Sequence, residues 1–233
     1  MSPQKSEFRK KVRRIEHLPL REHVYYIFCE ETKTEPQYFE EIKKAIERNP
    51  IYKNMVQIKV EGVGAETLRV IEAAEEKINT LKLKNAQVWC IYDKDDFSAD
   101  RFNQVPERVN NLNKNQMAVQ YMVGWSNQCI EYWFVLHFAF YDADNDRIYY
   151  RRFLDRKFKE LGWSKYEKNN SELFNILTTY GNPKLAINYA KQRLSRCSGC
   201  TASQSVPATK VHELVEELAK FLSDDIRNRC IDD

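Results

Sequence analysis

The first two-thirds of this 233-residue chain alternates between strand-like and helix-like segments, and this order constrains the fold more than any other feature. Short apolar runs with the length and composition of buried strands occur at residues 24–29, 57–63, 86–92 and 117–123. Amphipathic helical segments separate them, one starting at Thr34-Glu-Pro36. Such alternation is typical of a parallel sheet covered by helices. We therefore expect a three-layer α/β fold with a mainly parallel, four-stranded sheet.

The last third of the chain has a different pattern, which becomes helical from Gly124 onward. Helices are expected within residues 127–140, 151–161, 172–179, 183–194 and 210–222, with helix starts at Asn182-Pro183 and at Thr209. Residues 195–208 have the composition of a loop. We divide the chain into a basic N-terminal arm (1–22), an α/β core (23–141) and a helical C-terminal elaboration packed on that core (142–233).

Three carboxylates, Asp93, Asp95 and Asp96, crowd the exit of the third strand-like run. Like charges at this density cost free energy unless a cation lies among them, and Mg²⁺ bound through one or two carboxylates is a common solution. Residues alternate sides on an extended backbone, so Asp93 and Asp95 would face the same ion. An acidic, solvated loop is the alternative interpretation.

A second acidic pair, Glu30-Glu31, follows the first strand-like run. In parallel α/β sheets the ligand crevice lies at the carboxyl ends of the strands, where the winding direction reverses. If the first and third strands are neighbours at this reversal, Glu30 and the aspartates converge on one crevice.

Charge and cysteine content narrow the class of protein. The net charge is only +3, but basic residues cluster in the N-terminal stretch from Lys5 to Arg21 and again between Arg147 and Lys168, where they favour phosphate backbones or form solvated faces. No apolar run reaches membrane-span length and no signal peptide is evident, so we expect a soluble, cytoplasmic protein. Cys197 and Cys200 form one CxxC pair without a second pair at zinc spacing, which makes structural zinc a minor alternative.

Three segments of the chain carry a resemblance to a known family. They are Ile27-Phe-Cys-Glu30-Glu-Thr-Lys-Thr-Glu-Pro36-Gln-Tyr38-Phe39, Val88-Trp-Cys-Ile-Tyr-Asp93-Lys-Asp95-Asp96 and Ser126-Asn-Gln-Cys-Ile-Glu131-Tyr-Trp-Phe-Val-Leu-His137-Phe138. In order and spacing they resemble the motifs of the RloB family of phage-defence proteins, which carry a Toprim-type domain. This chain has Glu31 where the family commonly has glycine, and it departs from the third motif at Gln128 and Ile130.

The resemblance implies a metal-dependent site that acts on phosphodiester bonds. Its candidate catalytic residues are Glu30, Asp93 and Asp95, and its candidate ligands for one or two Mg²⁺ or Mn²⁺ ions are Glu30, Asp93, Asp95, Asp96 and Glu131. An arginine partner that only holds the helix is the alternative for Glu131. The candidate substrate-binding residues are Lys33, Ser126, Asn127 and His137. For Ser126 and Asn127 helix capping is the simpler account, and for His137 a place in the core.

The function implied is that of a Toprim nuclease, a Mg²⁺-dependent endonuclease cleaving RNA or DNA in bacterial anti-phage defence. The resemblance implies two partners, nucleic acid and a separate ATPase of the ABC or AAA type, beside which members of the family commonly operate. This chain has no phosphate-binding Gly-x-x-x-x-Gly-Lys-Ser/Thr loop, so any nucleotide hydrolysis would come from that partner. A homo-oligomer is possible on the sequence, and no membrane partner is expected. The alternative is a non-catalytic nucleic-acid-binding or assembly module. A phosphatase or glycosyltransferase using Asp-x-Asp is a third, weaker interpretation, because the motif follows the third strand instead of the first.

Overall fold

The computed structural model describes residues 21–115 and 118–232. Most of the basic N-terminal arm, from Lys5 to Arg14, therefore lies outside the described residues. At its described end, the Arg21 guanidinium donates a 2.9 Å hydrogen bond to the carbonyl of Val56.

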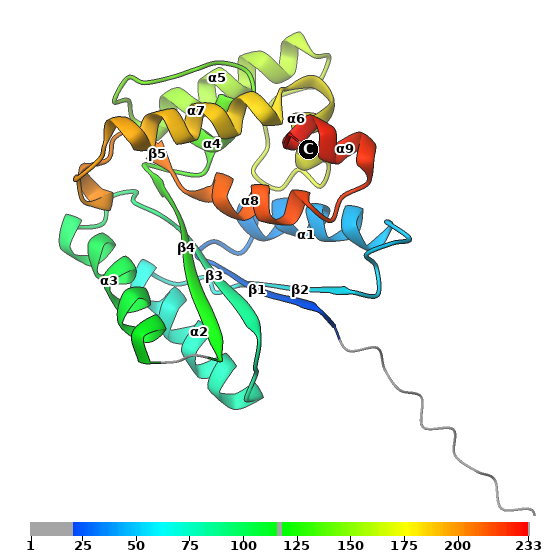
Figure 1. The fold of residues 1–233 in the computed structure, drawn as a ribbon. Helices are drawn as coiled ribbons and strands as arrows, with labels where there is room; N and C mark the ends of the chain where they lie inside the picture. Colours follow the sequence, from blue (N-terminus) through cyan, green and yellow to red (C-terminus); the bar gives the residue numbers. More distant parts are fainter. Residues whose placement is uncertain (1–20, 116–117, 233) are drawn as a thin grey trace, which may run out of the picture.

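A five-stranded sheet with the order β2-β1-β3-β4-β5 forms the centre of the molecule (Figure 1). β1 pairs in parallel with both β2 and β3, and β3 pairs in parallel with β4. The strands are β1 (His23–Cys29), β2 (Val56–Gly62), β3 (Ala86–Asp93), β4 (Val119–Asn127) and β5 (Ala208–Thr209). The expected adjacency of the first and third strands is confirmed, and the winding direction reverses between them.

Nine α-helices are described in residues 21–115 and 118–232, together with a short 3₁₀ turn at Ala202–Gln204. Four helices lie along the long parallel strands of the sheet, α1 (Thr34–Glu47), α2 (Thr67–Leu81), α3 (Ala99–Asn115) and α8 (Val211–Ala219). The others are α4 (Glu131–Leu136), α5 (Arg147–Glu160), α6 (Leu173–Tyr180), α7 (Pro183–Arg196) and α9 (Asp224–Cys230). None of these helices has both the length and the apolar character needed to cross a membrane.

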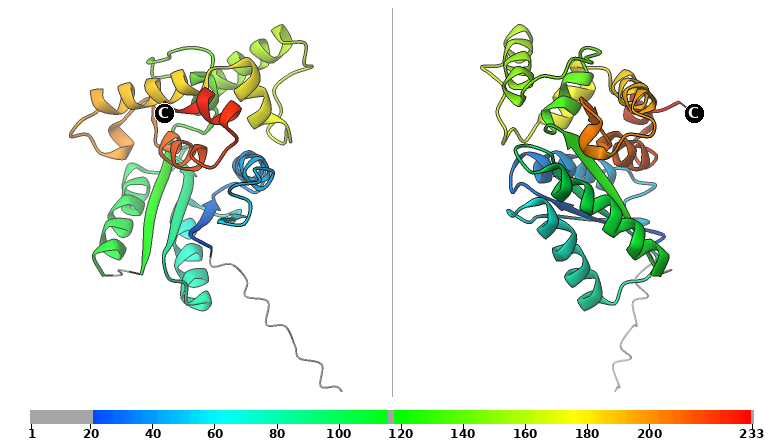
Figure 2. Two further views of the ribbon diagram at one scale, coloured as in Figure 1. Left: turned by 45° about the vertical axis from the view of Figure 1, so that its right-hand side comes forward. Right: turned by 90° about the vertical axis from the view of Figure 1, so that its left-hand side faces the viewer.

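Alternating side chains of the buried strands point into two separate cores, which makes the sheet the middle layer. Tyr26 and Phe28 of β1 pack with Val70 of α2 and Phe102 of α3 on one face. On the other face, α1 and α8 pack in a core that also includes α4 to α7 and α9. Figure 2 shows α2 and α3 separated by the sheet from α1 and α8. The expected α/β architecture is confirmed, with helices on both faces.

The C-terminal half of the sheet differs from the expectation. β4 continues through Ser126 and Asn127, which were expected to open a helix, and helix α4 is confined to Glu131–Leu136. The sheet has a fifth strand because Ser126 and Asn127 pair antiparallel with Thr209 and Ala208. Thr209 is therefore a strand residue, whereas Asn182 caps α7 as expected, its Oδ1 accepting from the backbone N–H of Leu185 at 3.0 Å.

Candidate functional site

The carboxyl ends of β1 and β3 place two acidic residues side by side. Cys29, the last residue of β1, pairs with Ile91 of β3, so Glu30 lies next to the end of β3 at Asp93. The Glu30 Oε2 accepts a 2.9 Å hydrogen bond from the backbone N–H of Asp93. The two candidate catalytic residues that the sequence places 63 positions apart are thus brought together by strand adjacency.

Asp93 is the most constrained carboxylate of this cluster. It is 5% exposed, and its Oδ2 accepts from the backbone N–H of Ile130 at 3.0 Å. Its Oδ1 is buried with no hydrogen-bond partner in the described chain. Burial and then the neighbouring charges of Glu35 and Asp95 raise the pKa of Asp93 well above its usual range. An unpartnered buried carboxylate oxygen is costly unless a proton or a ligand compensates it.

Glu30 is half-buried and lies at the mouth of the crevice. Burial raises its pKa to about 7, although the hydrogen bond from Asp93 N–H and a longer one from the Thr67 hydroxyl, at 3.4 Å, favour the charged form. A carboxyl group with a pKa near neutrality can accept or donate a proton under ordinary conditions.

Glu35 belongs to the same cluster, although its sequence position indicates only a residue of a helix start. It is fully buried in the first turn of α1. Its Oε2 accepts from the backbone N–H of Glu31 at 3.1 Å, whereas its Oε1 has no hydrogen-bond partner among the described residues. Burial, then the charge of Glu31, raises its pKa well above the usual range. A signal was present, because Glu35 shares a helical face with the buried Tyr38, Phe39 and Ile42.

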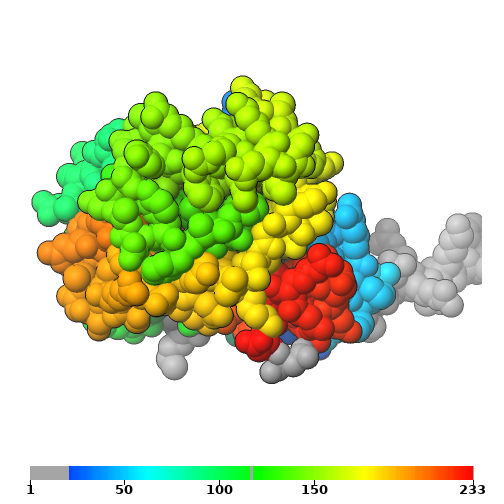
Figure 3. All heavy atoms as spheres, turned by 90° about the horizontal axis from the view of Figure 1, so that it is seen from above, coloured from blue at the N-terminus to red at the C-terminus, as the bar shows by residue number. Residues whose placement is uncertain are grey.

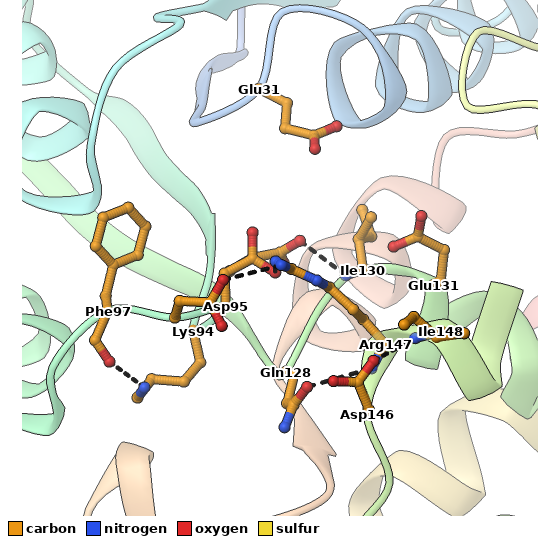
Figure 4. A network of polar contacts seen from close by, with 12 residues as sticks. Glu31, Lys94, Asp95, Phe97, Gln128, Ile130, Glu131, Asp146, Arg147 and Ile148 are labelled. Atoms are coloured by element: carbon orange, nitrogen blue, oxygen red, sulfur yellow. Dashed lines mark hydrogen bonds and ion pairs between the residues drawn. The ribbon is translucent and has the colours of Figure 1, made fainter.

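Asp95 and Asp96 are held by an arginine. Arg147, the first residue of α5, pairs with Asp95 Oδ1 and with Asp96 Oδ2, each at 2.9 Å. Figure 4 shows the Arg147 side chain reaching across to Asp95. The backbone of Asp95 has a left-handed φ of 36°, which residues with side chains seldom adopt, and its N–H donates to the carbonyl of Gln128 at 3.0 Å. Asp96 is almost fully exposed at the rim.

Glu131, the remaining candidate ligand, has an arginine partner, as its alternative interpretation predicts. It is 1% exposed at the start of α4, and its Oε1 accepts from the Arg151 Nε at 3.0 Å. A weaker contact of 3.5 Å joins the same oxygen to the hydroxyl of Tyr166. Its charge still acts on Asp93 and Glu35, since it contributes to raising the pKa of both.

A third cation contacts the edge of the cluster. Lys168, in the loop between α5 and α6, pairs with Glu31 Oε1 at 2.5 Å. Lys168 and the exposed Lys33 both line an open pocket of about 580 Å³ beside Glu30 and Glu31. The structure therefore brings Lys33 to the site, where two ammonium groups lie within reach of an incoming phosphate.

The other three candidate substrate-binding residues lie away from this pocket. The Ser126 hydroxyl bonds to the Thr209 hydroxyl at 3.0 Å, and the Asn127 amide donates to the carbonyls of Ala202 and Ser203. His137 is buried against Trp133, and its Nδ1 lies 3.0 Å from the carbonyl of that residue. All three polar groups are used within the fold, and the core interpretation of His137 is the one that the structure favours.

The carboxylate cluster fits a divalent cation in charge and in its unpartnered Asp93 oxygen, but it is not a closed cage. Among the described residues, no group of three or more His, Cys, Asp or Glu side chains is arranged to hold a metal ion, Cys197 and Cys200 included. At the strand ends, Asp95 and Glu131 pair with arginines. Mg²⁺ rarely uses an all-protein cage; it is commonly bound through one or two carboxylates, waters and substrate phosphates. Asp93 and Glu30, with Asp95 once released from Arg147, meet that requirement.

Comparison with known proteins adds one identification. No curated protein and no solved structure matches the chain. One family model does, that of the RloB-like protein family, and it matches residues 25–218. That range includes the sheet apart from the first two residues of β1, the carboxylate cluster, and α5 with its arginines. The chain therefore belongs to the RloB-like family.

Proposed function

We propose that this protein is a metal-dependent nuclease with a Toprim-like centre formed by Glu30, Asp93 and Asp95. The observation that carries the proposal is the Asp93 carboxylate, which is buried, has one unpartnered oxygen and lies beside Glu30 at the point where the winding of the sheet reverses. Ligand sites of parallel α/β sheets occur at such points. A purely structural carboxylate would be fully hydrogen-bonded or paired.

The chemistry follows from the groups at the site. Divalent ions bound there would stabilise negative charge on the attacking and leaving oxygens of a phosphodiester. Asp93 and Asp95 would hold the ions, with Asp96 at the rim. Glu30, with its pKa of about 7, is placed to accept a proton from water or to return one to the leaving oxygen. Lys33 and Lys168 would orient the scissile phosphate in the pocket beside Glu30.

The biological role in this proposal is that of an effector in bacterial anti-phage defence that works with a separate ATPase. Membership of the RloB-like family supports this role, together with the absence from the sequence of a phosphate-binding loop for nucleotide hydrolysis. Under this proposal the ATPase licenses cleavage, and the present chain supplies the cutting centre.

A non-catalytic nucleic-acid-binding module is the second candidate. The pairing of Asp95, Asp96 and Glu131 with Arg147 and Arg151 favours it, because cations of the protein itself already neutralise those carboxylates. The buried and unpaired Asp93 favours the nuclease, since a binding module gains nothing from it.

Cleavage assays separate the two candidates. The purified protein, alone and with its ATPase, is incubated with end-labelled RNA and DNA in Mg²⁺, in Mn²⁺ and in EDTA. We expect metal-dependent cleavage that Asp93→Ala and Asp95→Ala each abolish while the circular dichroism spectrum is unchanged. Undiminished cleavage by both variants would overturn the catalytic assignment.

A further inference from the structure

Helix α5 carries an exposed face that combines aromatic, apolar and basic side chains. Tyr149 is 57% exposed and Ile148 is 53% exposed, although both have large, mostly apolar side chains. Arg152 and Arg156 lie exposed on the same helix. We refer to Ile148, Tyr149, Arg152, Phe153 and Arg156 as the α5 outer face. In Figure 3, the yellow-green residues around α5 lie on a face that no other element covers.

The cations of the α5 outer face differ from their neighbours on the same helix. Arg147 and Arg151 pair with carboxylates of the cluster. Within residues 21–115 and 118–232, Arg152 and Arg156 have no ion-pair partner; Arg156 lies 5.7 Å from the centre of the Phe153 ring. Positive charge on this face is therefore uncompensated and available to an anion.

A pocket of about 260 Å³ opens between α5 and the chain that follows α4. Its lining includes Tyr141, Tyr149, Tyr150, Phe153, Arg152 and Arg156. Tyr150 is fully buried and forms part of the pocket wall. The pocket is thus a small aromatic cavity with two arginines at its edge that have no ion-pair partner among the described residues. Its size suits one planar ring better than a drug-sized ligand.

The pocket is connected to the carboxylate cluster by the helix surface. Successive residues of an α-helix are rotated by about 100°. Going around α5 from Arg147 and Arg151, Asp155 and Ile148 come next, then Arg152 and Arg156, and then Tyr149 and Phe153. The carboxylate of Asp155 accepts a 3.1 Å hydrogen bond from the backbone N–H of Tyr166. A flexible polyanion leaving the cluster can therefore cross the helix beside Ile148 and reach the basic and aromatic side chains at the pocket.

We propose that the α5 outer face binds single-stranded nucleic acid, with one unstacked base in the pocket against Tyr149 and Phe153 and its flanking phosphates on Arg152 and Arg156. Aromatic rings beside a basic track are the combination that single strands require, because every base offers a π-face. A duplex keeps its bases stacked and cannot fill the pocket. This inference rests on the proposed nuclease function and assigns to it the substrate class.

Binding is measured in EDTA by fluorescence anisotropy, using the full-length protein and a labelled 12-nucleotide RNA, the DNA of the same sequence, and the matching duplex. Tyr149→Ala is expected to weaken single-strand binding about tenfold, with Tyr149→Phe close to wild type and duplex binding unchanged. Tyr180→Ala is the matched control, since Tyr180 is 53% exposed on α6. Equal affinities for Tyr149→Ala and Tyr180→Ala, or tighter binding of duplex than of single strand, would overturn the proposal.

The salt dependence tests the arginines. Loss of two phosphate contacts lowers the slope of log Kd against log salt by about 1.4 for a single strand. We expect this change for Arg152→Ala combined with Arg156→Ala. We expect none for Lys44→Ala, near the end of α1, combined with Arg48→Ala directly after that helix. Equal changes in both pairs would indicate general charge attraction and contradict the assignment.

Cleavage assays on the same variants keep this inference distinguishable from the proposed function. Tyr149-dependent binding without cleavage in any metal would contradict the nuclease and leave the α5 outer face as a binding surface. Metal-dependent cleavage that Tyr149→Ala does not change would support the nuclease proposal and contradict the assignment of the α5 outer face as its substrate-binding surface.

Discussion

Glu30 accepts a hydrogen bond from the backbone N–H of Asp93 at 2.9 Å, which joins the carboxyl ends of β1 and β3. The bond fixes the direction of the Glu30 carboxylate beside Asp93. Burial is the main cause that raises the pKa of both groups, and the negative charge of Asp95 adds to both shifts. The charged forms are therefore unfavourable until a cation or a proton compensates them.

Neutralising Asp93 is expected to stabilise the metal-free protein. Asp93→Asn keeps the acceptor for the N–H of Ile130 and removes a buried charge that faces the negative charge of Glu35. We expect the melting temperature in EDTA to rise by about 2 to 4 °C for each kcal/mol gained, while cleavage is lost. Differential scanning calorimetry of wild type, Asp93→Asn and the exposed control Asp100→Asn measures this. A melting temperature lower than that of wild type would show that the Asp93 charge is compensated in the fold.

Divalent metal is expected to stabilise the wild type selectively. A ligand that binds only the folded state stabilises it by about 1.4 kcal/mol at ten times its Kd. Titration with Mg²⁺ or Mn²⁺ should raise the wild-type melting temperature, whereas Asp93→Asn should respond little. Glu66→Gln, at the exposed edge of the neighbouring pocket, serves as the control and should respond as wild type does. An equal response in Asp93→Asn would place the metal elsewhere.

The position of α5 could not be read from the sequence, and neither could the pairing of its arginines with the cluster. Periodicity located the helix near residues 151–161, but its contact with Asp95 and Glu131 depends on how α4 and the loop after it turn the chain. Local pattern contains no information on that turn. The adjacency of Glu30 and Asp93, in contrast, follows from strand order, which the rules of parallel sheets restrict to few solutions.

β5 and Glu35 were missed for different reasons. β5 has only two residues, and its pairing with Ser126 and Asn127 comes from a contact distant in sequence, stabilised by the Ser126 to Thr209 hydroxyl bond. Without knowledge of this pairing, the polar pair Ser126-Asn127 is more typical of a helix start than of a strand end. An acidic residue is common in the first turn of a helix, and Glu35 occupies such a position in α1. This local explanation accounts for the residue without placing it on the buried face of the helix.

Arg147 is expected to compete with metal for Asp95. Arg147→Met removes the cation paired with Asp95 while keeping an unbranched side chain. Exposed ion pairs contribute about 0.2 to 1 kcal/mol, so the affinity for Mn²⁺ should rise by about 1.4- to 5-fold. Isothermal titration calorimetry measures this, with Arg101→Met, whose partner Glu66 is exposed, as the control. Weaker metal binding in Arg147→Met would indicate that the arginine positions the Asp95 carboxylate for the metal instead of competing with the metal for it.

Two buried histidines are expected to make the stability fall in mild acid. Burial lowers the pKa of both His137 and His212 to about 4, below the value of about 6.5 for an unfolded chain. Between pH 4 and pH 6.5 the unfolded state then binds more protons than the folded state does. The contribution of the two buried histidines to the free energy of unfolding is therefore complete above pH 6.5 and is lost as the pH falls toward 4. Each shift corresponds to about 3 kcal/mol at most. Urea unfolding at pH 7.5, 6 and 5 should show a shallower fall for His137→Gln and for His212→Gln than for wild type; parallel curves would contradict the assignment.

The most direct test of the metal centre is anomalous diffraction from crystals soaked in Mn²⁺. We expect a peak about 2.1 Å from Asp93 Oδ1, with the Glu30 carboxylate beside it and Arg147 displaced from Asp95. An unoccupied Asp93 with the Arg147 to Asp95 pair intact, at Mn²⁺ concentrations that support cleavage, would contradict the central claim that this buried carboxylate is kept for a catalytic cation.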